Sequence, residues 1–483
     1  MDSKKLAMLT DFYELTMMNG FVKNSISEDI AVFDVFFREQ NESTYCIACG
    51  LEQVVDYIEN LVFTNSDIEY LKSLECFDNK FLLALRKFKF SGSIRAVPEG
   101  TVVFPNEPLL IVKGKIFEAQ LLESALLNII NFQTLIATKA SRIVNAANGK
   151  KVIEFGLRRA QGPDAALLGA RAAIIAGCDG TSNVLASKMY GTKPRGTHAH
   201  SWVTAFKSEL DAFRAYAKMY PDECLLLIDT YDTLKSGLKN ALIVFKELRE
   251  LGHEPLGVRL DSGDIAYLSK ETRKALDVNG FKDAKIFASG DLDEYTMTSL
   301  RSQGAKIDMY GVGTRLITSH SNPSLGGVYK IAAFGKEDNL RPKIKISDNP
   351  QKITNPGEKN LYRIYDKESG KAIADLIALK TEVIHEDKPL TLTHQVERWK
   401  SVTIENFYIK NLLQDVYVEG KLVYKKTKIS DIQKNCVASQ DEFWEEIKRL
   451  DKPQIFKVDL SDELYNLKQR LLLSGGVDYE QFK

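Results

Sequence analysis

The stretch Pro255-Leu-Gly-Val-Arg-Leu-Asp-Ser-Gly-Asp264 is an apolar run that ends abruptly in charged and glycine residues, and it decides the predicted fold. The same pattern recurs along the chain. The step from Asp229 to Arg259, like the step from Arg259 to Ser289, is 30 residues, which suits one strand followed by one helix. Comparable runs lie at 151–155, 225–229, 285–289 and 308–312.

These runs are apolar throughout rather than alternating, which is typical of strands in a parallel sheet whose faces are covered by helices. Each run ends in polar residues, and a β/α barrel builds its active site at that end of its strands. We therefore predict an α/β protein with a catalytic β/α barrel at 146–330, in preference to a doubly wound sheet.

The segments on either side of this barrel mix helix and strand. Apolar residues three or four apart predict a helix at 51–61, and short β runs broken by prolines lie at 93–113. We expect residues 1–145 to form an α+β domain. Residues 331–483 are expected to complete that domain and to end in a helical tail that starts near residue 440.

Composition excludes several classes of protein. The chain has 65 Lys and Arg against 65 Asp and Glu, without the basic surplus that is typical of nucleic-acid-binding proteins. Polar residues interrupt the most apolar stretch, 121–136, which predicts a buried helix rather than a membrane span. Residues 1–10 hold no apolar run of signal-peptide length, which favours a cytoplasmic location. Cys46 and Cys49 form a C-x-x-C pair with no second pair, so we interpret them as structural or incidental thiols.

Polar residues gather at the predicted strand ends, which meet at one edge of a parallel sheet. They offer carboxylates for a metal ion, arginines for an anion, and Gly, Ser and Thr turns that expose backbone N–H groups. The late turns Ser289-Gly290 and Gly311-Val-Gly-Thr314 lie where β/α barrels commonly bind a phosphate. The rim includes Glu154, Arg158, Thr197, His200, Asp229, Arg259, Asp261, Ser289, Gly290, Gly313 and Thr314.

His200 lies in Gly196-Thr-His-Ala-His-Ser201. On a strand, His198 and His200 would point to opposite faces, which disfavours a zinc site made by both. A nucleophilic or acid–base role for His200 needs a carboxylate on its other ring nitrogen, and Asp229 at the next strand end is the candidate. A histidine that packs in the core is the alternative interpretation.

Arg259 is followed by two acids that are three residues apart, Asp261 and Asp264, on a tight turn. An arginine in this arrangement can bind an anionic substrate while the acids face a Mg²⁺–polyphosphate. An internal salt bridge at the turn is the alternative interpretation.

The strand ends carry five motifs in order: Glu154-Phe-Gly-Leu-Arg-Arg-Ala-Gln-Gly-Pro-Asp164, Gly196-Thr-His-Ala-His-Ser-Trp202, Ile228-Asp-Thr-Tyr-Asp-Thr233, Val258-Arg-Leu-Asp-Ser-Gly-Asp264, and Gly311-Val-Gly-Thr-Arg315 followed by Pro323-Ser-Leu-Gly-Gly-Val-Tyr329. Together they resemble the nicotinate phosphoribosyltransferase family. Segments 9–17 and 137–142 also resemble it, and the likeness runs from about residue 6 to the end of the chain.

The resemblance implies a type II phosphoribosyltransferase fold and an enzyme of NAD salvage. Such an enzyme makes nicotinate mononucleotide and pyrophosphate from nicotinate and phosphoribosyl pyrophosphate. It also implies ATP as a co-substrate that is hydrolysed to ADP and phosphate through a phosphohistidine. Mg²⁺ would arrive with the phosphate substrates, and the protein would be a homodimer with shared active sites.

The resemblance also assigns roles to single residues. His200 matches the phosphorylated histidine, and Asp229 matches the acid that orients it. Thr197 and Arg259 match residues that hold nicotinate. Thr314 matches a residue that contacts phosphoribosyl pyrophosphate.

Tyr13 matches an aromatic that reaches into the neighbouring subunit's site and stacks on the pyridine ring. Related nicotinamide-specific enzymes carry an aspartate where this chain has Ser182, which favours nicotinate as the substrate. Nicotinamide phosphoribosyltransferase is the main alternative, followed by quinolinate phosphoribosyltransferase and by a non-catalytic binding homologue. We further predict a catalytic role for Asp261 and substrate contacts for Phe155, Arg158, Ser182, Ser289, Gly290 and Gly313.

Overall fold

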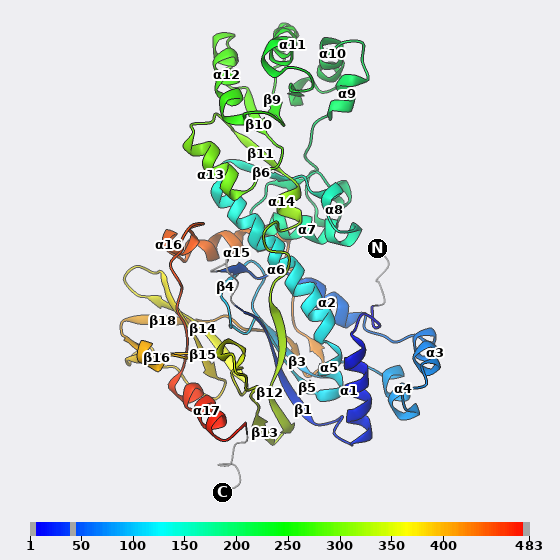
Figure 1. The fold of residues 1–483 in the computed structure, drawn as a ribbon, viewed down its shortest axis with the longest axis vertical. Coiled ribbons are helices and arrows are strands. Elements are labelled where there is room, and N and C mark those ends of the chain that lie inside the picture. Colours follow the sequence, from blue (N-terminus) through cyan, green and yellow to red (C-terminus); the bar gives the residue numbers. More distant parts are fainter. Residues whose placement is uncertain (1–5, 39–44, 477–483) are drawn as a thin grey trace. The chain divides into compact units, whose positions relative to one another are not determined.

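The computed structural model describes residues 6–38 and 45–476. The chain divides into two compact units (Figure 1). One unit contains residues 1–135 and 324–483, and the central unit contains residues 136–323. Residues 1–5, half of the stretch inspected for a signal peptide, lie outside the described residues.

A six-stranded parallel sheet forms the middle of the central unit, in the order β7-β6-β11-β10-β9-β8. Five of its strands confirm the predicted apolar runs, and β7 is an additional short strand. No ladder joins β7 to β8 among the described residues, so closure of the sheet into a barrel stays a prediction. The strands are β6 (Lys151–Glu154), β7 (Gly180–Thr181), β8 (Leu225–Leu227), β9 (Gly257–Leu260), β10 (Lys285–Ala288) and β11 (Met309–Val312).

Helices follow the strands of this sheet. Three of them, α10, α11 and α12, pack with strands β8 to β10 in one buried apolar cluster that includes Phe213, Phe245 and Phe281. Asp264 and Asp293 cap α12 and α13 by accepting backbone N–H groups, which sets where those helices begin. The helices are α7 (Pro163–Ile175), α8 (Val184–Tyr190), α9 (His200–Thr204), α10 (Glu209–Met219), α11 (Leu238–Glu250), α12 (Ile265–Val278), α13 (Glu294–Ser302) and α14 (Thr314–Ile317).

The segment before His200 is not a strand, so that prediction was wrong. Residues 192–199 have no regular structure, and His200 begins helix α9. Within 192–199 only His198 is buried, whereas a strand inside a parallel sheet buries nearly every side chain.

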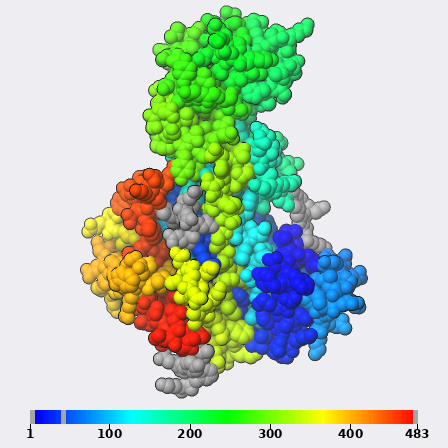
Figure 2. All heavy atoms as spheres, in the orientation of Figure 1, coloured from blue at the N-terminus to red at the C-terminus, as the bar shows by residue number. Residues whose placement is uncertain are grey.

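A seven-stranded sheet in the other unit combines segments from both flanks of the chain, in the order β13-β12-β1-β5-β3-β19-β20. Strand β1 lies between β5 and β12 and is antiparallel to both, with Ile30 opposite Lys115 and Gly335. Figure 2 shows these early and late segments side by side on the surface of this unit. The strands are β1 (Ile30–Phe37), β3 (Ser93–Ala96), β5 (Leu110–Lys115), β12 (Gly327–Lys336), β13 (Asn339–Pro342), β19 (Gln414–Val418) and β20 (Lys421–Leu422).

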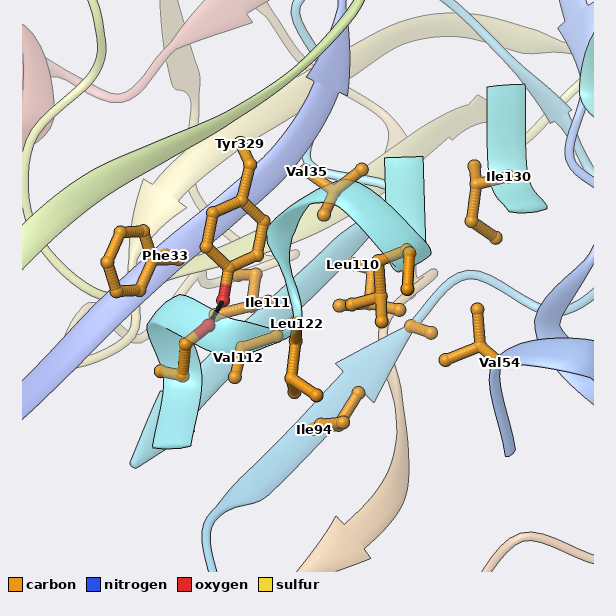
Figure 3. Close-up of a cluster of buried hydrophobic side chains, with 14 of the residues drawn as sticks. Phe33, Val35, Val54, Ile94, Leu110, Ile111, Val112, Leu122, Ile130 and Tyr329 are labelled. Carbon is orange, nitrogen blue, oxygen red and sulfur yellow. Dashed lines mark hydrogen bonds between the residues drawn. The ribbon is translucent and has the colours of Figure 1, made fainter. Parts of the chain in front are cut away.

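The core of this unit lies between the seven-stranded sheet and its helices (Figure 3). The ring of Tyr329 stacks on Phe33 with centroids 4.5 Å apart, and its hydroxyl donates to the carbonyl of Ala119 at 2.7 Å. A buried phenol therefore keeps its hydrogen bond while its ring fills the core. The helices are α1 (Phe12–Lys23), α2 (Leu51–Glu59), α3 (Asn65–Ser73), α4 (Asn79–Arg86), α5 (Ile116–Leu121) and α6 (Glu123–Ala146).

Six other strands between residues 359 and 460 form a second, mixed sheet in the order β17-β16-β21-β15-β14-β18. The expected helical tail is interrupted by strand β21, which pairs in parallel with β15, so that expectation held only for parts of the segment. A run as short as Val-Asp-Leu has no periodicity of its own and becomes a strand through its neighbours. The elements are β14 (Lys359–Asp366), β15 (Ala372–Leu379), β16 (Leu390–His394), β17 (Val402–Ile404), β18 (Phe407–Asn411), α15 (Ile429–Asp441), α16 (Glu445–Lys448), β21 (Val458–Leu460) and α17 (Asp462–Leu473), with β2 (Cys46–Ile47) and β4 (Val102–Val103) forming a separate pair.

Arg363 links three segments of this unit. Its guanidinium makes a two-pronged contact with Asp375, at 2.9 and 2.7 Å, and both side chains are fully buried. It also donates to the carbonyl of Val102 at 2.8 Å and lies 4.7 Å from the ring centre of Phe443. Burial of the carboxyl and the nearby charge of Asp375 raise the pKa of Glu107 well above its usual range, which keeps that side chain protonated beside the pair.

We predict that Arg363→Leu lowers the free energy of unfolding by about 3–5 kcal/mol, because it leaves the Asp375 carboxylate buried without its partner. The matched control is Arg214→Leu, which removes an exposed pair with Glu247 and is expected to cost much less. Thermal and urea denaturation followed by circular dichroism measure both changes. Equal losses in the two variants would contradict the prediction.

Candidate active site

The carboxyl ends of the six parallel strands bring the predicted polar residues to one edge of the central sheet. Phe155 and Ser182 follow β6 and β7, and Asp229 lies just beyond β8. Arg259 lies within β9, with Asp261 directly after that strand. The turns after β10 and β11 contribute Ser289, Gly290, Gly313 and Thr314.

Arg259 is the centre of this edge. Its Nε donates to Ser289 Oγ at 2.8 Å, and one terminal nitrogen donates to Asp261 Oδ1 at 2.8 Å. The other terminal nitrogen lies 3.4 Å from Thr197 Oγ1, which is the longest of the three contacts. The guanidinium carbon lies 5.4 Å from the ring centre of Phe155 and 5.9 Å from that of Phe287. The guanidinium is thus held in a fixed plane beside two aromatic rings.

Asp261 and Ser289 complete this network with a short hydrogen bond from the Ser289 hydroxyl to Asp261 Oδ1. Burial by itself would raise the pKa of Asp261. The hydrogen bond from Ser289 and the positive charge of Arg259 outweigh burial, so the pKa of Asp261 lies below its usual value. Asp261 therefore carries its negative charge at neutral pH.

His200 lies at the start of α9, with its side chain 44% exposed. Its Nδ1 lies 3.1 Å from Thr230 Oγ1, and its Nε2 lies 4.0 Å from Asp261 Oδ2. Sequence reasoning assigned the orienting contact to Asp229, but the structure gives this place to Thr230, the next residue.

Asp229 instead supports the turn after β9. Its Oδ2 accepts from the backbone N–H of Asp261 at 3.0 Å and from the hydroxyl of Ser262 at 2.6 Å. Its Oδ1 is buried and has no hydrogen-bond partner within the described part of the chain. The position of Asp229 at a strand end was predicted from the sequence. The direction of its side chain depends on how β8 and β9 pair.

His198 packs in the core, the alternative role that was considered for His200. Its Nε2 accepts from the backbone N–H of Leu227 at 3.2 Å, and its ring packs against the ring of Tyr216 at 4.7 Å. Burial lowers the pKa of His198 to about 4, so the ring is neutral at physiological pH.

The turn after β10 has an unusual backbone. Gly290 has φ +90°, and a β-carbon there would overlap the carbonyl oxygen of Asp261. Asp291, the next residue, has φ +40°, which side chains rarely adopt outside tight turns and functional sites. The turn after β11 continues directly into α14, with Gly313 at its N-terminal boundary and Thr314 as its first residue.

The other predicted residues have different local surroundings. Arg158 is exposed in the short 3₁₀ turn Leu157–Arg159, and the backbone N–H of Ser182 donates to the carbonyl of Glu154 at 3.0 Å. Tyr13 belongs to the other unit, on α1, and is 46% exposed. Cys46 and Cys49 are both buried in that same unit.

Residues 6–38 and 45–476 are the part of the chain that the structure describes. No helix in this part of the chain is long and apolar enough to cross a membrane. Nor does this part contain a group of three or more His, Cys, Asp or Glu side chains arranged to hold a metal ion.

Family models for three parts of one enzyme cover nearly the whole chain. The N-terminal domain model of nicotinate phosphoribosyltransferase matches residues 8–131, the family model matches 150–377, and the C-terminal domain model matches 358–468. The chain belongs to the nicotinate phosphoribosyltransferase family.

Individual members of this family agree over nearly their full length. The nicotinate phosphoribosyltransferase of Bacillus subtilis is 45% identical over 466 residues, which cover 96% of this chain and 95% of that protein. The Bos taurus protein of the same name is 30% identical and 97% covered on both sides. The crystal structure of human nicotinic acid phosphoribosyltransferase superposes with a TM-score of 0.85 at 29% identity, covering 96% of this chain and 99% of that one.

Two residues of this nicotinate phosphoribosyltransferase family member were not singled out from the sequence. Thr230 contacts His200, and Phe287 lies beside Arg259. Thr230 follows directly after Asp229 in a quoted motif, which was a usable signal. Phe287 lies inside an apolar run, where nothing in the pattern separates an aromatic at a site from one in the core.

We predict that Gly290→Ala impairs this site while the protein stays folded. The new methyl group meets the carbonyl of Asp261 in a left-handed backbone conformation, so the turn after β10 has to shift. The expected result is a loss of at least about tenfold in kcat/KM for nicotinate mononucleotide formation. Gly304→Ala is the matched control, because Gly304 also has positive φ but its β-carbon would meet open space. Equal activity of the two variants would contradict this prediction.

Proposed function

We propose that this chain joins nicotinate to phosphoribosyl pyrophosphate for NAD salvage, and couples the step to ATP hydrolysis through phosphorylated His200. The observation that carries the proposal is the Arg259 guanidinium, which Ser289 and Asp261 hold in place beside the ring of Phe155. A planar cation next to an aromatic surface suits a ligand that is itself an aromatic ring bearing a carboxylate.

The reaction needs orientation more than a protein nucleophile. The pyridine nitrogen of nicotinate forms a bond to C1 of the ribose, while the bond from C1 to the pyrophosphate oxygen breaks. Arg259 would orient the ring through its carboxylate, using the terminal nitrogen that has only the 3.4 Å contact with Thr197. Positioning of this kind can supply much of the rate enhancement of a two-substrate reaction.

The leaving pyrophosphate needs its charge neutralised. We propose that Mg²⁺ enters as part of the phosphoribosyl pyrophosphate substrate, and that the charged Asp261 faces this complex. The buried, unpartnered Oδ1 of Asp229 would accept from a water of the same complex. The glycine turns after β10 and β11 would bind the 5′-phosphate through backbone N–H groups. Glycine fits at positions 290 and 313 because a β-carbon there would meet the carbonyl oxygens of Asp261 and Phe155.

His200 would accept the γ-phosphoryl group of ATP. A ring nitrogen attacks the phosphorus, the bond to ADP breaks, and water later releases the phosphate. The contact with Thr230 at Nδ1 would orient the ring, and the 44% exposure of the side chain gives ATP access. Phosphorylation adds up to two negative charges near Asp261, which would reorganise this edge before or after substrate binds.

We also propose a homodimer located in the cytoplasm. Helix α1 and the residues before it expose a row of large apolar side chains, Leu9, Phe12, Tyr13 and Met17, at spacings that place them on one face. A second copy covering this row would remove it from water and would bring Tyr13 to the partner's substrate site.

We predict that Arg259→Lys lowers kcat/KM for nicotinate by about a hundredfold or more and adds little activity with nicotinamide. Lysine keeps the charge but loses the planar fork that matches a carboxylate. Ser182→Asp is expected to lower nicotinate use as well, through repulsion of the carboxylate. The measurement is kcat/KM for both substrates with and without ATP, and Arg214→Lys on the surface is the control. Wild-type values for the two substrates within a few-fold of each other would favour a nicotinamide enzyme.

We predict that His200→Ala abolishes acid-labile phosphate trapped from radiolabelled ATP and removes the stimulation of the reaction by ATP. A slow ATP-independent transfer should persist, because the histidine does not attack the ribose. His320→Ala, at another exposed histidine, is the control and should label normally. Labelling of a histidine in the His200→Ala protein would contradict the assignment of His200 as the phosphorylated residue.

A further inference from the structure

Asp293 uses both of its carboxylate oxygens in different contacts. Its Oδ1 accepts from the backbone N–H of Thr296 at 2.8 Å, which caps helix α13. Its Oδ2 accepts from a terminal nitrogen of Arg315 at 2.7 Å. The Asp293 side chain is 8% exposed, so this ion pair is largely shielded from water on the acid's side.

These two contacts join the two glycine turns of the site. Asp293 ends the turn that begins with Ser289 and Gly290 after β10. Arg315 is the second residue of α14, directly after Gly313 and Thr314. One carboxylate therefore connects the first turn of α13, which follows the β10 turn, with the side chain of Arg315 in α14, which follows the β11 turn.

Contacts of Ser289 and of Glu294 also hold the β10 turn in place. Ser289 donates to Asp261 and accepts from Arg259 at the start of the turn. Glu294, directly after Asp293, forms a buried ion pair with Lys139 of α6 at 2.7 Å. Gly290 and Asp291 within the turn both have positive φ. Strands β10 and β11 are joined by their ladder, and beyond its carboxyl end Asp293 adds a side-chain contact to Arg315.

We propose that Asp293 is a positioning residue that sets the spacing between the two turns that bind the phosphate of phosphoribosyl pyrophosphate. This inference rests on the proposed function, which places that phosphate between them. Backbone N–H groups from two separate turns bind one anion well only if their separation is held, because an error of about 1 Å weakens every bond they make. The Asp293 carboxylate supplies that constraint.

The competing explanation is that Asp293 only caps helix α13 and has no role in spacing the two turns. Substitutions of Asp293 distinguish the two explanations. Asp, Asn and Ser are comparable helix N-caps, so a capping role alone predicts similar behaviour for all three. Asparagine still reaches Arg315 but offers a neutral acceptor in place of a charged one. Serine is too short to reach it. A spacing role therefore predicts a graded loss, with Asp293→Ser more affected than Asp293→Asn.

The experiment measures steady-state kinetics for both substrates and the Kd of Mg²⁺–phosphoribosyl pyrophosphate by calorimetry. For Asp293→Ser we expect KM and Kd for phosphoribosyl pyrophosphate to rise about tenfold or more, with a smaller rise for Asp293→Asn. The KM for nicotinate and the melting temperature should stay close to wild type. Asp308→Ser is the matched control, because Asp308 bridges the same two strands at their opposite ends by accepting from the N–H of Ile286 at 2.9 Å.

The results distinguish a failure of the positioning role of Asp293 from a failure of the proposed function. Values within twofold of wild type for both Asp293 variants, equal losses in the two, or an equal loss in Asp308→Ser would overturn the positioning role. If the wild-type chain forms no nicotinate mononucleotide, the proposed function fails, and the calorimetric Kd for the phosphate substrate still decides whether Asp293 controls its binding.

Discussion

The contact of Arg259 with Ser289 and Asp261 is the interaction on which the rest of the site depends. It joins strand β9, which carries the arginine, to the turn after the neighbouring strand β10. The hydrogen bond from Ser289 and the charge of Arg259 keep the pKa of Asp261 below its usual value despite burial, and Asp261 in turn lies 4.0 Å from His200.

The parallel sheet explains why residues from five separate motifs meet. Four of the five motifs lie at the carboxyl end of a strand, and neighbouring strands in register place those ends side by side. The fifth, 196–202, lies in the irregular segment that leads into α9. This part of the structure was predictable because buried parallel strands are apolar throughout and end where polarity begins. The strand positions and the grouping of polar residues at one edge followed from that rule.

Other features depend on contacts that a local pattern does not contain. Asp229 and Thr230 are adjacent, and only the pairing of β8 with β9 decides which of them contacts His200 and which supports the β9 turn. The zinc argument considered His198 and His200 on a strand, whereas 192–199 have no regular structure. Strand β21 is three residues long and exists because β15 offers it a free edge. In each case the deciding partner lies elsewhere in the chain.

The pairing of β1 between β5 and β12 has a consequence for how the protein is made. Ile30 emerges from the ribosome about 300 residues before Gly335, its partner in the ladder. Until then one edge of an apolar strand has no neighbour, and such edges are prone to pair with other chains. The central unit has all its own strands in continuous sequence and can fold during this interval. Synthesis is therefore the stage at which this edge is open to pairing with other chains, and a chain that stops short of β12 would leave it open for good.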